Sequence, residues 1–175
     1  MGKMMVRGAL LLLCLLVGGC GEGGGVDTGT TGSASLSAAT ASTQETLELG
    51  TFSALLGEER FLTTSGKGEF DLEYAMLTLS ASGETEGGRS ASLLLRISGV
   101  RQPGTFPLGG ESGNHAGVTL DTALFNTLLG GSGNLTITSL SIDIVEGTFT
   151  FTAGDGLGGE ISVTEGLFRV PTTPL

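Results

Sequence analysis

Few residues of this chain have the type and spacing that chemistry requires, and Cys20 is the clearest of them. It follows Gly18-Gly19 at the end of an apolar run, residues 9–17, and the basic residues Lys3 and Arg7 precede that run. A basic start, an apolar segment and a small-residue cleavage site, in that order, are typical of an export signal. The cysteine thiol is the group that diacylglycerol alkylates in bacterial lipoproteins. We therefore expect Cys20 to be the lipidated first residue of the mature chain.

Residues 16–20, Leu-Val-Gly-Gly-Cys, look like the lipobox that lipoprotein signal peptidase recognises, with Val17 at the usual position of Leu. A spanning helix would need about 20 apolar residues, and this run is shorter. The nearer alternative is an ordinary secretory signal with a soluble product. Gly21 stands where an inner-membrane retention signal would place Asp, which favours the outer membrane if the cell is Gram-negative.

Other side chains offer little for catalysis. His115 is the only histidine, and we place it in a loop, residues 110–117, as a solvated residue. Cys14 leaves with the signal, so the mature chain has no free thiol and no disulfide. Residues 154–159 satisfy G-x-G-x-x-G, but a dinucleotide site needs a helix after this motif, and a strand is expected next. We interpret the segment as a hairpin loop and expect no catalytic residue.

Carboxylates are numerous, so calcium is the metal to consider. Asp155 with Glu160, or Asp71 with Glu73, would offer hard oxygen ligands, yet the array of an EF-hand loop is missing. We expect no metal and no cofactor, and we leave open whether Asp155 and Glu160 bind a metal. A glycosidase can draw two carboxylates from distant strands, but the chain has no Trp and a single Tyr, Tyr74, with which to stack a sugar.

The charge of the mature chain is strongly negative. All 18 acidic residues follow Cys20, and two of the eight basic residues leave with the signal, which gives 6 − 18 = −12. Phosphate binding depends on clustered Lys and Arg. We therefore expect no nucleic-acid partner and no attraction to anionic lipid surfaces.

Composition divides the chain into three parts. Residues 1–19 form the signal peptide. Residues 20–44, the lipidated Cys and a segment rich in Gly, Ser, Thr and Ala, are expected to be a flexible tether because such a composition cannot bury enough apolar surface to become ordered. Residues 45–175 have the size of a single domain, which we expect to be a single β domain.

Within that domain apolar residues recur with a period close to two, which indicates half-buried strands. The alternation changes phase at Ser139, and a β-bulge there would keep both apolar sets on one face. We interpret Glu146-Gly147 as a turn. The strands expected in this part are residues 135–138, 140–144, 148–152, 160–164 and 167–170, and the core residues are Phe149, Phe151, Ile161, Val163, Leu135 and Ile137.

The upstream part has weaker signals of the same kind. Residues 93–97 are expected to form a central strand, and Pro107 restricts its strand to an edge because proline has no N–H to donate. A short helix is the alternative to a strand over 123–129. The remaining candidate strands are residues 47–56, 60–64, 69–74, 75–81 and 118–120. Such spacing predicts an all-β fold, an antiparallel β-sandwich or flattened barrel.

Five segments of the domain resemble a known pattern. They are Phe52-Ser53-Ala54, Gly104-Thr105-Phe106-Pro107-Leu108-Gly109, Gly133-Asn134-Leu135-Thr136-Ile137-Thr138, Glu146-Gly147-Thr148-Phe149-Thr150-Phe151-Thr152-Ala153 and Ile161-Ser162-Val163-Thr164-Glu165-Gly166-Leu167-Phe168. They are similar to the motifs F-x-A, G-T-Y-x-L-G, G-x-L-T-I-T, S-G-T-F-x-F-x-A and V-T-I-T-x-G-x-F of an uncharacterised family of bacterial envelope lipoproteins. The chain departs from the pattern at Glu146, at Phe106 and at Arg60-Phe61. The resemblance implies a β-rich, lipid-anchored domain without an established activity.

Two classes of function follow. The first is a lipid-anchored cell-envelope protein with a non-catalytic β domain, which binds an envelope protein, a glycan or a small apolar ligand through a sheet face or a barrel mouth. The second is a hydrolase of unrecognised type, acting in the periplasm or at the cell surface. A pocket that holds two close carboxylates, or His115 beside a carboxylate, would favour the hydrolase.

Overall fold

The computed structural model describes residues 47–175. The expected signal peptide (1–19), Cys20 and the tether (20–44) lie outside the described residues. In the part that is described, no helix has the length and apolarity needed to cross a membrane. The regular secondary structure of this part consists of strands and one short 3-10 turn, which confirms the all-β prediction.

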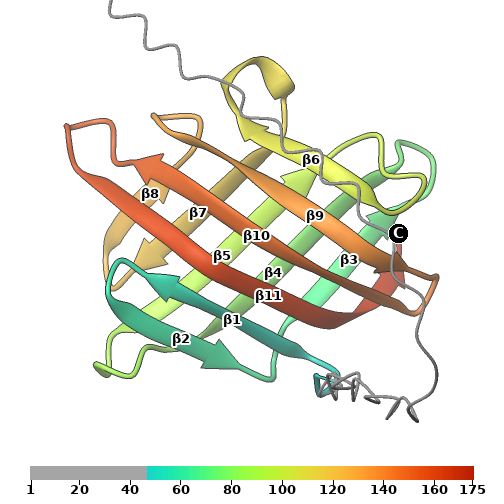
Figure 1. Ribbon diagram of the computed structural model, residues 1–175, viewed down its shortest axis with the longest axis horizontal. Helices are drawn as coiled ribbons and strands as arrows, with labels where there is room; N and C mark the ends of the chain where they lie inside the picture. Colours follow the sequence, from blue (N-terminus) through green and yellow to red (C-terminus); the bar gives the residue numbers. More distant parts are fainter. Residues whose placement is uncertain (1–46) are drawn as a thin grey trace, which may run out of the picture. The chain divides into compact units, whose positions relative to one another are not determined.

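The strands are β1 (Thr51–Leu56), β2 (Glu59–Thr63), β3 (Lys67–Asp71), β4 (Met76–Glu84), β5 (Ser90–Ile97), β6 (Gly104–Gly109), β7 (His115–Leu120), β8 (Ala123–Asn126), β9 (Ser132–Leu140), β10 (Ile144–Gly154) and β11 (Glu160–Pro174), with one short 3-10 turn, η1 (Gly110–Ser112). They form one 11-stranded sheet with the order β2-β1-β11-β3-β4-β5-β7-β8-β10-β9-β6 and a further pairing of β11 with β10. Figure 1 shows that this sheet folds over itself into two layers, with β2, β1, β11, β10, β9 and β6 in front and β3, β4, β5, β7 and β8 behind.

The two layers are joined along both sides. On one side the end of β11 pairs with β3, Thr172 opposite Gly68, and a bridge between Phe61 and Thr85 ties β2 to the end of β4. On the other side β10 meets β8 where Gly154 pairs with Asn126. The structure is therefore a two-layered sheet closed on itself, which agrees with the predicted sandwich or flattened barrel.

One pairing departs from the antiparallel prediction. β11 runs parallel to β3, whereas the other strand pairs in residues 47–175 are antiparallel. The reason is the length of β11, 15 residues. Its first part pairs with β1, and its last residues extend beyond β1 to reach β3 along the same edge.

The core lies between the layers, as the alternating pattern predicts. All six predicted core residues are at most 8 % exposed, and the residues that alternate with them along each strand lie on the solvent side. Phe149 lies at the centre, with ring centroids 5.1 Å from Phe52, 6.2 Å from Phe151 and 6.3 Å from Phe168. Such tilted and offset aromatic pairs add to the free energy gained by burying the rings themselves.

The predicted bulge in β9 is confirmed, but the strand expected after it is wrong. Glu146 pairs with Ser139 and Gly147 with Ile137, so Thr138 is the additional residue. Residues 141–143 form the hairpin between β9 and β10, in which the amide of Ser141 donates to the Ile144 carbonyl at 2.9 Å. The sequence predicted a strand here because Ile142 continues the apolar alternation with a period of two, although its side chain is 65 % exposed.

The turn expected at Glu146-Gly147 is also wrong, because both residues lie inside β10. Gly147 pairs directly with Phe168 of β11. A Cβ on Gly147 would collide with the carbonyl oxygen of Thr136 and lie 2.7 Å from Cζ of Phe168. The glycine therefore provides space for an aromatic ring, whereas sequence reasoning took it as a sign of chain reversal.

Residues 160–164 and 167–170, expected as two strands, are parts of the single strand β11. A bulge joins them. Val163 pairs with Phe151 and Gly166 with Phe149, so β11 carries one residue more than β10 over this stretch. Glu165, which lies in this bulge, adopts the left-handed conformation with φ 51°. One common class of β-bulge has a residue in this conformation.

The upstream expectations are largely confirmed. β5 is central, between β4 and β7, although only one of its faces is buried and Leu94 is 42 % exposed. β6, which contains Pro107, is an edge strand, and residues 123–126 form a strand and not a helix. The strand expected over 69–74 lies slightly earlier in the chain, since β3 begins at Lys67 and ends at Asp71.

Candidate functional site

His115 does not lie in the loop predicted for it. It is the first residue of β7, half-buried, and pairs across the sheet with Arg96 of β5. The preceding residue, Asn114, fixes the start of this strand. Its Oδ1 accepts from the backbone N–H of Ser98 at 2.9 Å, and its Nδ2 donates to the Pro107 carbonyl at 2.9 Å. The strand register thus brings a cation opposite the imidazole, where a general base would need a carboxylate.

The aspartates considered as metal ligands serve their own loops. Oδ1 of Asp155 accepts the N–H groups of Leu157 at 2.7 Å and Gly159 at 2.8 Å, which closes the predicted hairpin loop between β10 and β11. These two hydrogen bonds lower the pKa of Asp155. Asp71 caps the loop after β3 in the same way, accepting from Glu73 at 3.0 Å. Within residues 47–175, no group of three or more His, Cys, Asp or Glu side chains is placed to hold a metal.

The surface has two depressions of note. The first, which we call the outer groove, is an open hollow of about 450 Å³ on the front layer. Hydroxyl and amide side chains make up half of its lining residues, and Arg60, 3.8 Å from Glu165, lies at its side. Its lining residues are Ser53, Arg60, Asn134, Thr136, Thr148, Phe149, Thr150, Glu165, Gly166 and Leu167.

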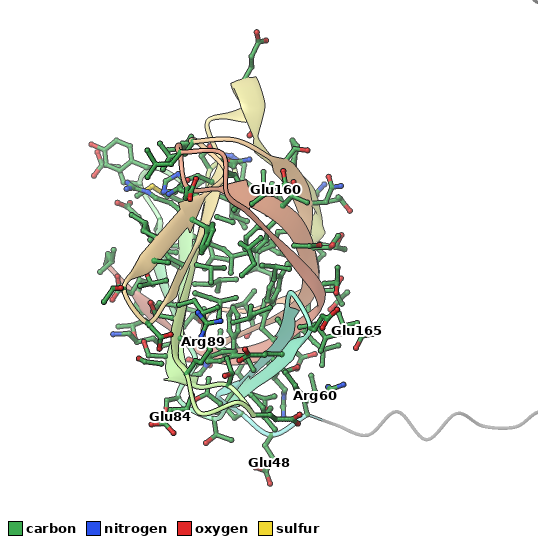
Figure 2. All side chains as sticks on the ribbon, turned by 90° about the vertical axis from the view of Figure 1, so that its left-hand side faces the viewer. Glu48, Arg60, Glu84, Arg89, Glu160 and Glu165 are labelled. Carbon is green, nitrogen blue, oxygen red and sulfur yellow. The ribbon has the colours of Figure 1, made fainter. Side chains whose placement is uncertain are left out.

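The second depression, which we call the interlayer cleft, has a volume of about 400 Å³. It lies at the end of the domain where the β1–β2 and β7–β8 hairpins meet the start of β11, and Figure 2 faces this end, with Arg89 and Glu160 labelled. Its lining residues are Leu56, Gly57, Glu58, Glu59, Arg89, Leu120, Ala123, Phe125, Glu160 and Ile161. The floor is apolar, since Leu56, Leu120 and Ile161 are 2, 5 and 8 % exposed. Charged side chains form the rim.

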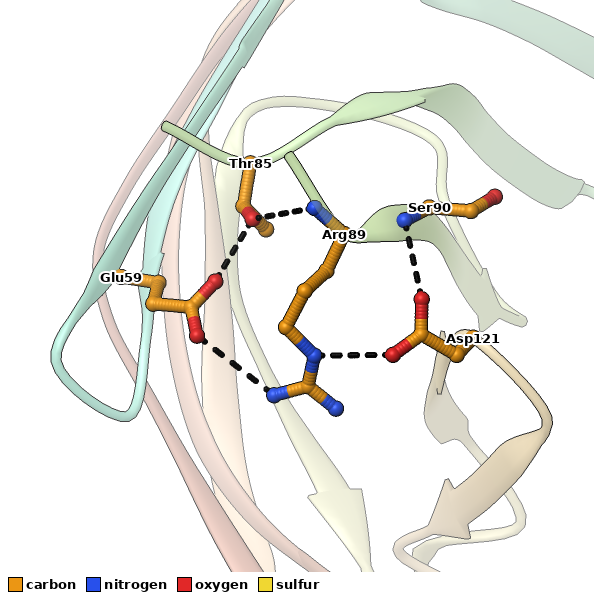
Figure 3. A network of polar contacts seen from close by, with 5 residues as sticks. All are labelled: Glu59, Thr85, Arg89, Ser90 and Asp121. Atoms are coloured by element: carbon orange, nitrogen blue, oxygen red, sulfur yellow. Dashed lines mark hydrogen bonds and ion pairs between the residues drawn. The ribbon is translucent and has the colours of Figure 1, made fainter. Parts of the chain in front are cut away.

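A polar network holds the rim of the interlayer cleft in place (Figure 3). Arg89 Nε donates to Oδ2 of Asp121 at 2.9 Å, and Arg89 Nη1 lies 3.5 Å from Oε1 of Glu59. The other carboxylate oxygens accept from Thr85 Oγ1 at 2.6 Å and from the N–H of Ser90 at 3.1 Å. These contacts tie together three turns that are distant in sequence, β1–β2, β4–β5 and β7–β8.

The electrostatics of the network follow from its hydrogen bonds. The hydrogen bond from Arg89 is the largest cause of the lowered pKa of Asp121, and burial, the second-largest cause, opposes it. The same bond is the largest cause that raises the pKa of Arg89. Both groups are charged at neutral pH, and the positive charge of Arg89 is already balanced by two carboxylates. What the rim offers a ligand is therefore negative charge.

Sequence reasoning missed the interlayer cleft. Its parts come from residues 56–59, 89, 120–125 and 160–161, which no local pattern connects. One weak signal was present. Leu56 and Leu120 each end a strand directly beside a turn that carries a charge, and Ile161 follows Glu160 at the start of β11. An apolar residue buried at a strand end indicates that something covers that end of the sheet, and here these three residues line one cleft.

Residues 51–171 match the model of a protein family described as Domain of unknown function (DUF6252). Neither the curated proteins nor the solved structures contain a match.

Proposed function

The chain belongs to this family, and we propose that it is a lipid-anchored cell-envelope protein whose β domain binds a ligand without converting it. The observation that carries the binding role is the interlayer cleft. Its volume of about 400 Å³ falls in the range of small-molecule sites, about 300 to 1,000 Å³. An apolar floor with a few polar groups at the rim is the usual composition of such sites.

The anchor is supported by the first 20 residues of the sequence, in which a basic start, an apolar segment and Gly18-Gly19-Cys20 follow in the required order. A second acyl chain on the freed amine of Cys20 would make attachment durable, since one chain alone anchors only marginally. A coil of the length of residues 21–43 spans about 25 Å on average. This distance is enough to hold the β domain clear of lipid headgroups at the outer membrane, the location we favour.

The geometry around the ionisable groups supports binding over hydrolysis. His115 lies opposite Arg96 on the neighbouring strand, and Asp155 accepts hydrogen bonds from its own loop. In the interlayer cleft, both carboxylate oxygens of Glu59 already have protein partners, since one accepts a hydrogen bond from Thr85 and the other lies beside Arg89.

The anchor is tested by labelling cells with a fatty-acid analogue. The wild type should be labelled and shortened by 19 residues, the length of the expected signal. The Cys20→Ala form should stay unlabelled and unprocessed, and Cys14→Ala is the matched control that should behave like the wild type. Equal labelling of the wild type and Cys20→Ala would refute the anchor.

The absence of turnover is tested on the purified, processed protein with ester, glycoside, peptide and phosphate substrates. We expect no activity above that of a preparation from cells that lack the gene. Turnover that is abolished by Glu59→Gln, Glu160→Gln, Asp155→Asn or His115→Ala would refute the non-catalytic role and establish the hydrolase in its place.

A further inference from the structure

We propose that the interlayer cleft binds an apolar group that carries a positive charge, such as an alkyl chain that ends in an ammonium group. This inference rests on the proposed binding function and adds the chemical class of the ligand. It follows from two properties of the same cleft, the apolar floor and the sign of the charge at the rim.

The floor selects for an apolar body. Leu56, Leu120 and Ile161 are almost completely buried beneath it, and the half-buried Phe125 together with Ala123 forms the wall on the side of β8. Water in such a hollow has few polar partners on the floor. Replacing it with a short alkyl chain removes apolar surface of both ligand and protein from water, which is favourable and gives no preference for any charge.

The rim gives the preference for charge. Glu58, Glu59 and Glu160 contribute three carboxylates, and Asp121 beside Arg89 a fourth, against the one guanidinium, so the balance is 1 − 4 = −3. Glu58 and Glu160 are exposed, and within residues 47–175 neither takes part in an ion pair. No cationic side chain in this part of the chain compensates their charge, so both carboxylates are available to attract a cationic ligand.

Arg89 does not reverse this preference. Its Nε is bonded to Asp121 at 2.9 Å and its Nη1 lies beside Glu59 at 3.5 Å. An anionic ligand, such as a fatty acid, would have to compete with both carboxylates for Arg89 and approach Glu58 and Glu160 as well. A cation meets the opposite situation, because a charge at the mouth of a cleft with apolar walls is screened less than one on an open surface.

The test compares three ligands of equal chain length, hexyltrimethylammonium, hexanol and hexanoate, with the processed protein in nanodiscs of zwitterionic lipid. Binding is followed by ligand-observed NMR, and empty nanodiscs provide the background. We expect the ammonium to bind about tenfold more tightly than hexanol, with hexanoate weakest, and its affinity to fall as salt is raised. An affinity of hexanol or hexanoate equal to that of the ammonium would overturn the charge preference.

Two variants with the same change in net charge locate the effect. Glu58→Gln/Glu160→Gln alters the rim, whereas Glu73→Gln/Glu111→Gln alters two exposed glutamates outside the cleft. The rim variant should lose about the tenfold advantage of the ammonium over hexanol, and the control should keep it. Equal losses in the two variants would overturn the proposal, since they would indicate a response to the net charge of the protein.

Ala123→Trp separates failure of the inference from failure of binding at the cleft. Ala123 is exposed on the wall, so a Trp there fills the cleft without entering the core. It should abolish binding of the ammonium. If hexanol binds as tightly as the ammonium and Ala123→Trp abolishes both, the charge preference is wrong while the binding function stands. If Ala123→Trp leaves the affinity of the ammonium unchanged, the cleft is not the site.

Discussion

Phe149 on β10 and Gly166 on β11 are direct cross-strand partners, and the ring of Phe149 occupies the space where a side chain on Gly166 would lie. Two positions along, Gly147 and Phe168 form the same kind of pair with the roles of the strands exchanged. The two phenyl rings thus come within 6.3 Å of each other in the core. Each glycine lacks a side chain because its partner strand supplies a ring in its place.

This arrangement predicts a marked effect of one added methyl group. A Cβ on Gly166 would lie 2.5 Å from Cδ2 of Phe149 and against the Phe149 carbonyl oxygen, which is backbone and cannot move aside. Gly166→Ala should lower the free energy of unfolding by about 1 to 3 kcal/mol, the usual effect of overpacking. Urea unfolding measures this. Gly104→Ala, where the nearest atom is 3.9 Å away, is the matched control and should change stability by less than about 0.5 kcal/mol.

The ring itself should matter more than its glycine. Phe149 is 3 % exposed and contacts three other phenylalanine rings. Phe149→Ala should cost about 3 to 5 kcal/mol of stability, because it removes apolar contacts and leaves a cavity. Thr148→Ala, one residue earlier on the outer face of the same strand, should have almost no effect in the same urea titration. Equal losses from the two substitutions would contradict the assignment of inner and outer faces.

Asn114 predicts a cost of a different origin. It is 5 % exposed and bonds to Ser98 and to the carbonyl of Pro107, which joins the end of β5 to the edge strand β6. Asn114→Ala leaves these groups without partners, and we expect a loss of about 1 to 3 kcal/mol. Asn134→Ala, exposed on β9, is the control. A loss no larger than that of the control would show that water replaces these hydrogen bonds fully.

The network at the cleft predicts a dependence of stability on pH. The pKa of Asp121 is lowered below its ordinary value of 3.8, first by the hydrogen bond from Arg89. Its contribution to stability is therefore fully present above that value and is lost as the pH falls through the lowered pKa of the folded protein. Asp121→Asn keeps a residue that tolerates the left-handed backbone found here, φ 57°.

The stability of the wild type should therefore exceed that of Asp121→Asn at neutral pH, and the difference should shrink as the pH is lowered below 3.8. Thermal unfolding over pH 2 to 7 measures it. In an Arg89→Gln background the difference should be much smaller at every pH, because the hydrogen bond that causes it is gone. A difference that grows on acidification would contradict the role of this pair.

The sequence predicted correctly those structural features that a single residue, or the pattern within a single strand, determines. Pro107 restricted β6 to an edge because proline has no N–H to donate, and the change of phase at Ser139 located a bulge. The six core residues were predictable because alternation in β9, β10 and β11 reports directly which face is buried. These are properties of a single strand.

The predictions failed where a feature depends on residues of more than one strand. Gly147 was interpreted as a turn because only its partner, Phe168, shows that the missing side chain is compensated across the sheet. The parallel pairing of β11 with β3 depends on the length of β11 relative to β1, which neither segment reveals alone. The interlayer cleft depends on four segments at once, and the pairing of Arg89 with Asp121 joins residues 32 positions apart.

β11 has a consequence for the order in which the domain is assembled. It follows in sequence all three strands with which it pairs, β1, β3 and β10. A chain that leaves a ribosome or an export channel from its N-terminus therefore presents β1 and β3 well before their common partner. Until β11 emerges, one edge of each remains open, and such edges pair readily with other chains. Completion of the fold depends on a late, long-range step, so we expect the domain to close only after β11 has emerged.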